Sequence, residues 1–177
     1  WENLMKKELT KRIISSIILV PFALFFIIKG SILFNFFIFI CFLITTYEWY
    51  MMTKKKKYNL FGFLFLIISF YSIYKLRHNL PGDYAWFLGV TIVCVATDIG
   101  GYIFGKIFKG PKLTKLSPNK TYAGMVGGYI LSIISINIFL QNSHFDGSLT
   151  LSREIFIFVL LISLISQVGD IIISYFK

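Results

Sequence analysis

Six long apolar segments follow one another along the chain and limit what it can fold into. A run of about 20 apolar residues can cross the hydrocarbon core of a membrane as an α-helix. In hydrocarbon every backbone polar group needs a hydrogen-bond partner within the protein, which only helices and closed barrels provide. These runs lack the alternation of apolar and polar residues that is typical of the strands of a membrane barrel. The sequence therefore predicts an all-α, polytopic transmembrane helix bundle with about six spans. The predicted spans cover residues 13–28, 32–47, 60–74, 84–108, 122–140 and 155–176.

Composition excludes an ordinary soluble protein, because 56% of the residues are hydrophobic and only 15% are charged. We expect one integral-membrane domain over residues 1–177, with N-terminal spans in 1–105, a basic loop in 106–121 and two last spans in 122–177. The first three segments are short, and Trp49, Tyr50 and Tyr58 can anchor their extended ends at the interface. Only residues 29–31 part the first two segments. A tight helical hairpin and a single tilted or re-entrant element both remain open.

The positive charge of the chain favours a membrane orientation rather than a nucleic-acid partner. The net charge is +10, but the basic residues lie between apolar runs, where topology and anionic membrane lipid explain them. With the N-terminus in the cytoplasm, fourteen of the 18 lysines and arginines fall on the inside. We therefore expect a multi-pass protein of the bacterial inner membrane with a cytoplasmic 106–121 loop. Cys41 and Cys94 lack the spacing of a disulfide framework or a zinc site.

Two aspartates stand out inside the apolar segments. Asp98 lies eight residues before Lys106, and Asp170 lies seven residues before Lys177. At about 1.5 Å per residue, both carboxylates lie roughly 10–12 Å inside the cytoplasmic ends of their helices. A carboxylate at this depth usually faces a polar interior, a partner or an ion, and carboxylate oxygens suit Mg²⁺. A structural carboxyl, or two acids that share a proton in a helix contact, is the alternative.

The segment 105–121 is the third polar feature. Its lysines can neutralise phosphate charge, and its hydroxyls with the free amides of a following helix can bind phosphate oxygens. Glycines at the head of that helix allow close approach of a ligand or a backbone. A positive-inside loop on anionic lipid, followed by small-residue packing, explains the same residues equally well. The candidate substrate-binding residues are Lys106, Lys112, Ser117, Lys120, Thr121 and Gly124.

Several motifs in order resemble the phosphatidate cytidylyltransferase (CDP-diglyceride synthase) family. Residues 98–102 (Asp-Ile-Gly-Gly-Tyr) and 104–106 (Phe-Gly-Lys) resemble its acid-x-(Gly/Ser)-Ala-Tyr-x-x-Gly-(Lys/Arg) element. Residues 117–128, from Ser-Pro-Asn-Lys-Thr to Gly-Gly, resemble its Ser-Pro-x-Lys-Thr-aromatic-x-Gly-x-x-Gly-Gly element. Residues 169–170 (Gly-Asp), with Ser174 and Lys177, resemble the start of its final signature. Residues 9–15 with Pro21, and residues 47–49, resemble its opening, so that the likeness covers nearly the whole chain.

The resemblance implies a reaction between CTP and phosphatidic acid that gives CDP-diacylglycerol and pyrophosphate, assisted by Mg²⁺. It implies catalytic and metal-binding roles for Asp98 and Asp170. It also implies that the lysine-bearing loop binds the triphosphate or the lipid phosphate, and that the protein forms a homodimer.

The chain departs from the family pattern at three places. Tyr122-Ala123 stands where many relatives have Trp-Glu, and Ile173 stands where they usually have Glu. Relatives continue beyond the position of Lys177 with a Pro-Gly-His-Gly-Gly and an Asp-Arg-x-Asp element, which implies that this chain is C-terminally truncated. An inactive, catalytically incomplete fragment is one expectation for it. An ion-coupled membrane transporter component is the other alternative, because intramembrane acids also mark ion pathways.

Overall fold

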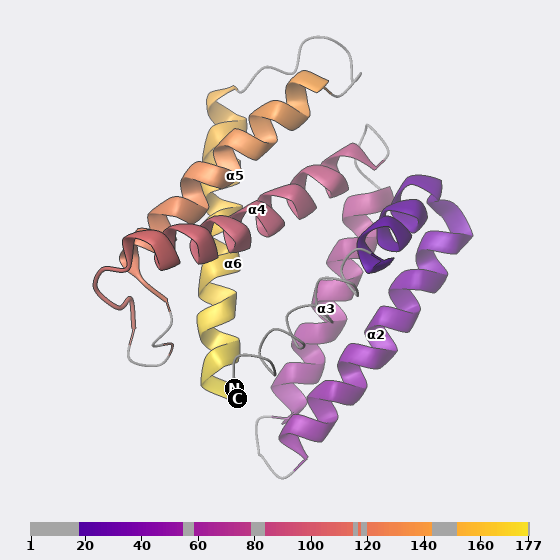
Figure 1. The fold of residues 1–177 in the computed structure, drawn as a ribbon. Helices are drawn as coiled ribbons and strands as arrows, with labels where there is room; N and C mark the ends of the chain where they lie inside the picture. The colour runs from indigo at the N-terminus through magenta and orange to yellow at the C-terminus, as the bar shows by residue number, and fades with distance from the viewer. Residues whose placement is uncertain are drawn as a thin grey trace. The chain divides into compact units, whose positions relative to one another are not determined.

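The computed structural model describes residues 18–54, 59–78, 84–114, 117, 120–142 and 152–176. Five helices in this part of the chain are long and apolar enough to cross a membrane. They are α2 (Ser31–Thr53), α3 (Asn59–His78), α4 (Ala85–Phe108), α5 (Tyr122–Asn142) and α6 (Arg153–Phe176) (Figure 1). A shorter apolar helix covers Ile18–Lys29. The prediction of an all-α, polytopic membrane protein is confirmed.

The helices are longer than the apolar runs that predicted them. Helix α2 has 23 residues and α3 has 20, and at about 1.5 Å per residue each can cross a hydrocarbon core of about 30 Å. Helix α2 includes Trp49 and Tyr50, as the expected extension into the flanks requires. The beginning of the predicted 13–28 span, and Tyr58, lie outside the described residues.

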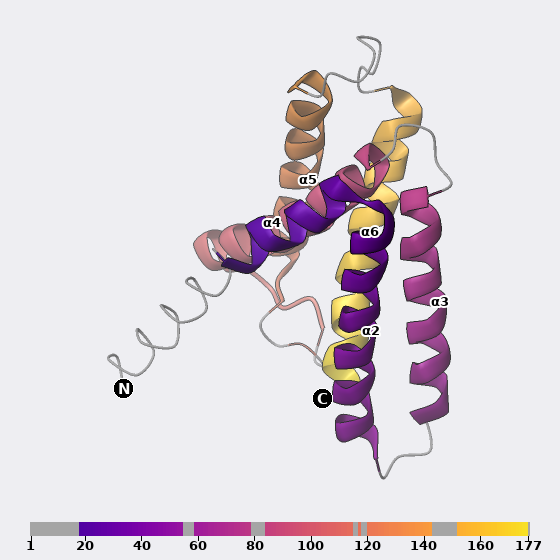
Figure 2. The ribbon, with the colours of Figure 1, turned by 90° about the vertical axis from the view of Figure 1, so that its right-hand side faces the viewer.

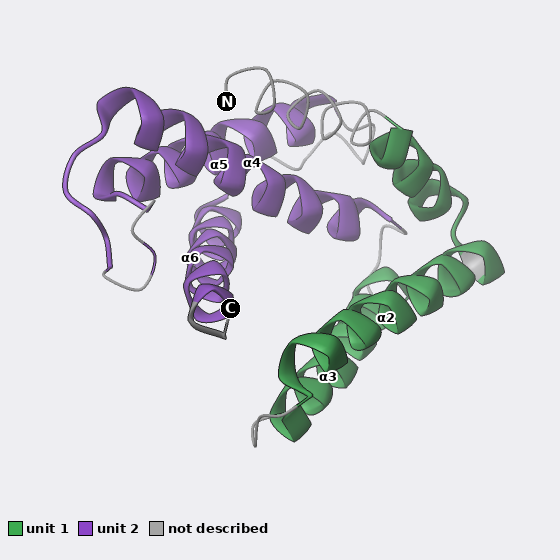
Figure 3. Cartoon of the chain, turned by 60° about the horizontal axis from the view of Figure 1, so that its bottom comes forward, with its two compact units in different colours: residues 1–80 green, residues 81–177 purple. Residues whose placement is uncertain are grey.

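The chain divides into two compact units, residues 1–80 and 81–177 (Figure 3). The described part of the first unit contains the short helix, α2 and α3, and that of the second contains α4, α5 and α6. A single domain over residues 1–177 stays a prediction.

Gly30 separates the short helix from α2. Its φ of 60° lies in the left-handed region that favours glycine, and the chain bends sharply there (Figure 2). The ring of Phe26 stacks on that of Phe37 in α2, with centroids 5.1 Å apart. The Nε of Arg77 in α3 donates a hydrogen bond of 3.3 Å to the carbonyl oxygen of Ile27. The two apolar segments are therefore separate helices joined at a bend, and not one continuous helix.

Glycines allow α4 and α5 of the second unit to approach closely. A Cβ atom placed on Gly100 would lie 2.5 Å from the carbonyl oxygen of Gly127. A Cβ atom on Gly124 would lie 2.6 Å from the carbonyl oxygen of Gly101. Lipid tails are as apolar as leucine side chains, so membrane helices associate through this kind of backbone contact. The packing interpretation of the glycines at the head of α5 is therefore supported.

A small apolar core joins the three helices of the second unit. It contains one buried residue from each helix, Val93 in α4, Ile136 in α5 and Val159 in α6. Beside it, the buried hydroxyls of Thr97 and Ser163 are hydrogen-bonded, with their oxygens 2.9 Å apart. These contacts position α6 against the part of α4 that carries Asp98.

Candidate active site

The loop between α4 and α5 folds back on itself and brings its basic residues to the start of α5. Lys109 and Gly110 both have positive φ angles, 51° and 82°, and turn the chain at the end of α4. The backbone N–H of Leu113 then donates to the carbonyl oxygen of Lys120 at 2.7 Å. Lys112 and Thr121 form an isolated antiparallel bridge next to this bond. The backbone of Lys120 is therefore held in place before the helix begins.

Thr121 caps the N-terminus of α5. Its Oγ1 accepts a hydrogen bond of 3.1 Å from the backbone N–H of Gly124, three residues into the helix. This is the usual way in which a threonine satisfies a free amide at a helix start. The hydroxyl acts as an acceptor in this bond, so its hydrogen can still be donated to another oxygen.

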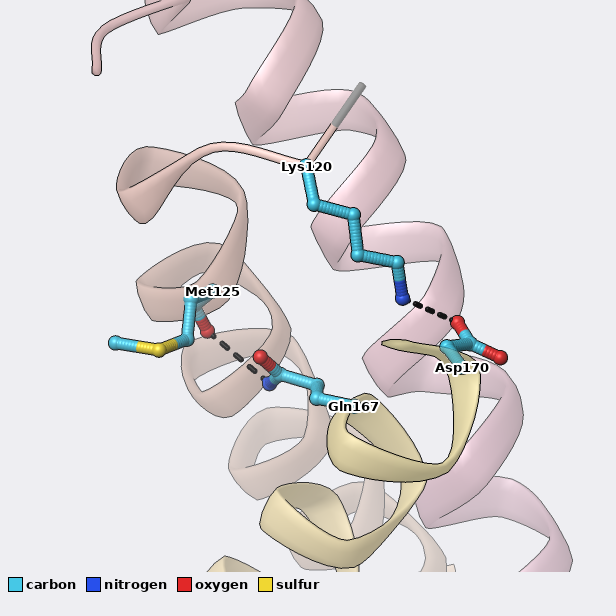
Figure 4. A network of polar contacts seen from close by, with 4 residues as sticks. All are labelled: Lys120, Met125, Gln167 and Asp170. Carbon is cyan, nitrogen blue, oxygen red and sulfur yellow. Dashed lines mark hydrogen bonds and ion pairs between the residues drawn. The ribbon is translucent and has the colours of Figure 1, made fainter. Parts of the chain in front are cut away.

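Lys120 and Asp170 form an ion pair across the site. The Nζ of Lys120 lies 2.5 Å from the Oδ2 of Asp170 on α6 (Figure 4). The lysine side chain is 31% exposed and that of the aspartate is 51% exposed, so the pair is accessible from outside. Asp98 on α4, which is also exposed, lines the same cavity as both members of the pair. Three charged groups from three elements thus gather in one place.

These charged groups line a cavity of about 250 Å³ within the second unit. It is lined from α4 by Thr97, Asp98, Gly101 and Tyr102, from the loop by Leu113, Ser117, Lys120 and Thr121, and from α5 and α6 by Gly124, Met125, Gln167 and Asp170. The wall is mostly apolar, with the hydroxyls, the carboxylates and the ammonium group as its polar points.

The structure brings together six of the eight residues that the sequence suggested. They are Asp98, Ser117, Lys120, Thr121, Gly124 and Asp170. Lys106 and Lys112 do not line the cavity. Lys106 belongs to the last turn of α4 and not to a loop, and its Nζ lies 3.4 Å from the hydroxyl oxygen of Tyr102. Lys112 is exposed and contributes to the backbone bridge of the loop. The chemical roles of all eight stay predictions.

Sequence reasoning gave no role to Gln167, which lines the cavity on α6. Its Nε2 donates a hydrogen bond of 3.3 Å to the carbonyl oxygen of Met125 (Figure 4). In an apolar segment, an uncharged amide indicates a functional site less strongly than an aspartate does. The position of Gln167 three residues before Asp170 nevertheless places both side chains on one side of the helix.

The donor set of the cavity is compatible with Mg²⁺. Asp98 and Asp170 supply hard carboxylate oxygens, and Mg²⁺ is commonly held by one or two carboxylates together with substrate phosphates. No group of three or more His, Cys, Asp or Glu side chains that could hold a metal occurs among the described residues. The residues therefore fit an ion shared with a phosphate substrate better than a site built entirely from protein ligands.

Comparisons with known proteins identify the same group that the motifs suggest. A model of the cytidylyltransferase family matches residues 59–177. A protein named phosphatidate cytidylyltransferase from Rickettsia conorii is 32% identical over 179 residues, which cover 97% of this chain and 76% of the relative. A relative of that name from Rickettsia bellii is 31% identical, with 97% of this chain and 76% of the relative covered.

A relative from a plant, phosphatidate cytidylyltransferase 1 from Arabidopsis thaliana, is 34% identical over a shorter stretch of 105 residues. That alignment covers 54% of this chain and 25% of the relative. No solved structure matches the chain significantly. The family match covers the whole cavity, from Thr97 to Asp170, and the Rickettsia relatives align over nearly all of the chain. The chain therefore belongs to the cytidylyltransferase family.

Proposed function

We propose that this chain transfers a cytidylyl group from CTP to phosphatidic acid, giving CDP-diacylglycerol and pyrophosphate for phospholipid biosynthesis. The observation that carries the proposal is the cavity in which Lys120, Asp170 and Asp98 meet between transmembrane helices. Family membership and the printed names of the relatives support it, and they favour an enzyme over the transporter alternative.

The transfer needs positioning and charge neutralisation more than covalent help from the protein. A phosphate oxygen of phosphatidic acid attacks the α-phosphorus of CTP. The bond between that phosphorus and the oxygen that bridges to the β-phosphate breaks, and pyrophosphate leaves with its electron pair. In this proposal the ammonium group of Lys120 neutralises phosphate oxygens. Ser117 and Thr121 donate hydroxyl hydrogens, and the remaining free amides at the start of α5 add further donors.

Mg²⁺ is the cofactor that the carboxylates would hold. Asp98 and Asp170 would be its protein ligands, and the ion would neutralise charge on the phosphate oxygens. Asp170 is paired with Lys120 in the structure. Only its Oδ2 makes that contact, so the second oxygen remains for another partner.

A lipid substrate and a nucleotide substrate together define where such a site must lie. Phosphatidic acid stays in the membrane, whereas CTP is dissolved in the cytoplasm, so the cavity must open near the inner surface. We propose accordingly that the protein lies in the bacterial inner membrane, with the N-terminus, the last turn of α4 and the loop that follows it (residues 106–121) in the cytoplasm. The excess of lysine and arginine in the segments assigned to the inside supports this orientation. The homodimer that the resemblance implies stays a prediction.

Substitution of Asp170 tests the proposal. In the full chain, purified in detergent and supplied with CTP, phosphatidic acid and Mg²⁺, Asp170→Asn should lower turnover by about 10²-fold or more, because one preorganised charge is lost. Glu154→Gln is the matched control, since Glu154 lies in the first turn of the same helix and does not line the cavity. Near-normal turnover of Asp170→Asn would refute the proposed role of this carboxylate.

A further inference from the structure

A row of polar side chains runs along one side of α6. Ser163, Gln167 and Asp170 follow one another at intervals of four and three residues, which places them on one face of a helix. Each contacts a different part of the second unit. Ser163 binds Thr97 of α4, Gln167 binds the carbonyl oxygen of Met125 in α5, and Asp170 binds Lys120 of the loop.

Gln167 occupies a space that glycine leaves open. A Cβ atom placed on Gly128 of α5 would lie 3.0 Å from the Nε2 of Gln167 and 3.0 Å from the carbonyl oxygen of Thr97. The amide therefore lies against α5 at a place where Gly128 has no side chain and where a Cβ atom would be in tight contact with it. The distance from Nε2 to the Met125 oxygen is 3.3 Å, and the residue is partly buried. For a partly buried amide, loss of this hydrogen bond without a replacement would cost free energy.

The contact between Lys120 and Asp170 cannot by itself keep α6 in register with α5. Both side chains are partly exposed, and ion pairs of this kind hold their geometry weakly. If Lys120 turns toward a phosphate, Asp170 loses its partner. The bond from Gln167 to Met125 lies one helical turn away and does not depend on Lys120 (Figure 4).

We propose that Gln167 is a positioning residue, which fixes α6 against the first turn of α5 and so holds Asp170 at the cavity wall during the reaction. The inference rests on the proposed function for its catalytic consequence. The tether itself does not depend on that function.

The catalytic consequence is tested with Gln167→Met, which keeps the bulk of the side chain and removes the amide. We expect the Mg²⁺ concentration for half-maximal activity to rise by about 10-fold to 100-fold, whatever the change in kcat, as for other groups that orient a metal ligand. A smaller folded fraction would lower the rate without moving the Mg²⁺ midpoint.

Gln141→Met is the matched control, because Gln141 makes a contact within α5 and does not line the cavity. It should leave both kinetic quantities unchanged. An equal Mg²⁺ midpoint for the wild type and Gln167→Met would overturn the positioning role, even if kcat fell.

A second measurement needs no activity. Lys120→Cys and Asp170→Cys are combined in a chain whose Cys41 and Cys94 are replaced by Ala, and a short bifunctional thiol reagent joins the new cysteines. Intact-mass spectrometry follows the rate of bridging. Adding Gln167→Met should slow bridging several-fold, whereas adding Gln141→Met should not. An unchanged rate would overturn the tether even if Asp170 proves catalytic. A slowed rate together with a fully active Asp170→Asn would instead keep the tether and refute the proposed role of the Asp170 carboxylate. A slowed rate in a chain that shows no cytidylyl transfer would keep the tether and refute the proposed function.

Discussion

At the scale of single residues, the ion pair between Lys120 and Asp170 contributes little to stability. Exposed pairs contribute about 0.2–1 kcal/mol, because water screens the charges and two side chains lose conformational freedom. Both side chains of this pair are partly exposed. The ion pair contributes too little stability to explain why a lysine and an aspartate lie together in a cavity. Binding of a ligand in the cavity explains their position better.

Lys120→Met should separate the two roles of this lysine. Hydrogen bonds to charged groups contribute about 1.5–3 kcal/mol, so the loss of one to a phosphate should raise the KM for CTP by about 10-fold to 100-fold. The midpoint of unfolding in denaturant should shift by less than the equivalent of about 1 kcal/mol. Steady-state kinetics and an unfolding titration in the same detergent measure both quantities.

Lys109→Met is the control for this lysine, since Lys109 belongs to the same loop, is exposed and does not line the cavity. Its KM should equal that of the wild type. If Lys120→Met instead unfolded the protein and left the KM of the folded fraction unchanged, the lysine would be a structural residue only.

Charge explains which residues of the site could be predicted. Asp98 and Asp170 stand out because an ionised group inside an apolar segment needs a reason to be there. The pattern did not distinguish Lys120 from Lys106 and Lys112. That difference arises from the folded loop, where the bond from the N–H of Leu113 to the oxygen of Lys120 fixes the backbone of that lysine. Such a bond pairs residues that no periodicity connects.

At the scale of helices, the crossing of α4 and α5 depends on the absence of side chains. Gly100 and Gly101 face Gly124 and Gly127, and the backbones meet where these residues lie. Asp98 and the capping Thr121 flank the same contact. The distance between the two helices therefore determines the distance between the groups that they carry into the cavity.

Gly100→Ala should disturb this crossing. The new Cβ atom would lie 2.5 Å from the carbonyl oxygen of Gly127, and a backbone atom can yield only if the helices move apart. Overpacking of this kind destabilises by about 1–3 kcal/mol. We expect a lower unfolding midpoint in detergent, together with lower activity because α4 carries Asp98.

Gly169→Ala is the matched change on α6, where a Cβ atom would meet nothing within 4 Å. Alanine is preferred over glycine inside a helix by about 0.5–1 kcal/mol, so this variant should be as stable as the wild type or slightly more so. Equal stability of Gly100→Ala and Gly169→Ala would contradict the close crossing.

The boundaries of the helices show that hydropathy does not predict where a membrane helix ends. The apolar run predicted a span that ends at residue 47, whereas α2 continues to Thr53. The extra turns are held by side-chain contacts with the start of α3. The Nε1 of Trp49 donates to the carbonyl oxygen of Asn59 at 3.2 Å, and the Oγ1 of Thr53 lies 2.7 Å from the Oδ1 of Asn59. Polar residues at a membrane interface can remain helical, and an apolar average does not detect them.

At the scale of the whole molecule, the fold class followed from one constraint, the need to satisfy backbone groups in hydrocarbon. The same constraint does not predict which faces of the helices pack against one another. In α2 and α3, apolar residues surround the helix instead of forming one stripe, so no face is marked as the contact face. The glycines of α4 and α5 were the exception, because small residues in membrane helices indicate close contact.

The distribution of positive charge predicts the orientation, and labelling of introduced cysteines can test it. Lys109 follows α4 at the end assigned to the cytoplasm, and Asn142 ends α5 at the end assigned to the outside. Both are exposed and neither lines the cavity. In chains whose native cysteines are replaced by Ala, a membrane-impermeant maleimide should label Asn142→Cys in intact bacterial cells. It should label Lys109→Cys only after the inner membrane is opened.

This orientation decides whether the proposed chemistry can occur in a cell. Asp98 lies in the half of α4 that leads to Lys109, and the loop that carries Lys120 joins that end to α5. If Lys109→Cys were labelled in intact cells and Asn142→Cys were not, the loop would face away from cytoplasmic CTP. The cavity could then bind phosphate but could not receive the nucleotide, and the proposed reaction would be excluded even if each residue of the site had its expected charge and contacts. A damaged inner membrane would give equal labelling at both positions before and after opening. A cytoplasmic protein with an exposed cysteine, followed in the same cells, detects such damage because it is labelled only when the membrane leaks.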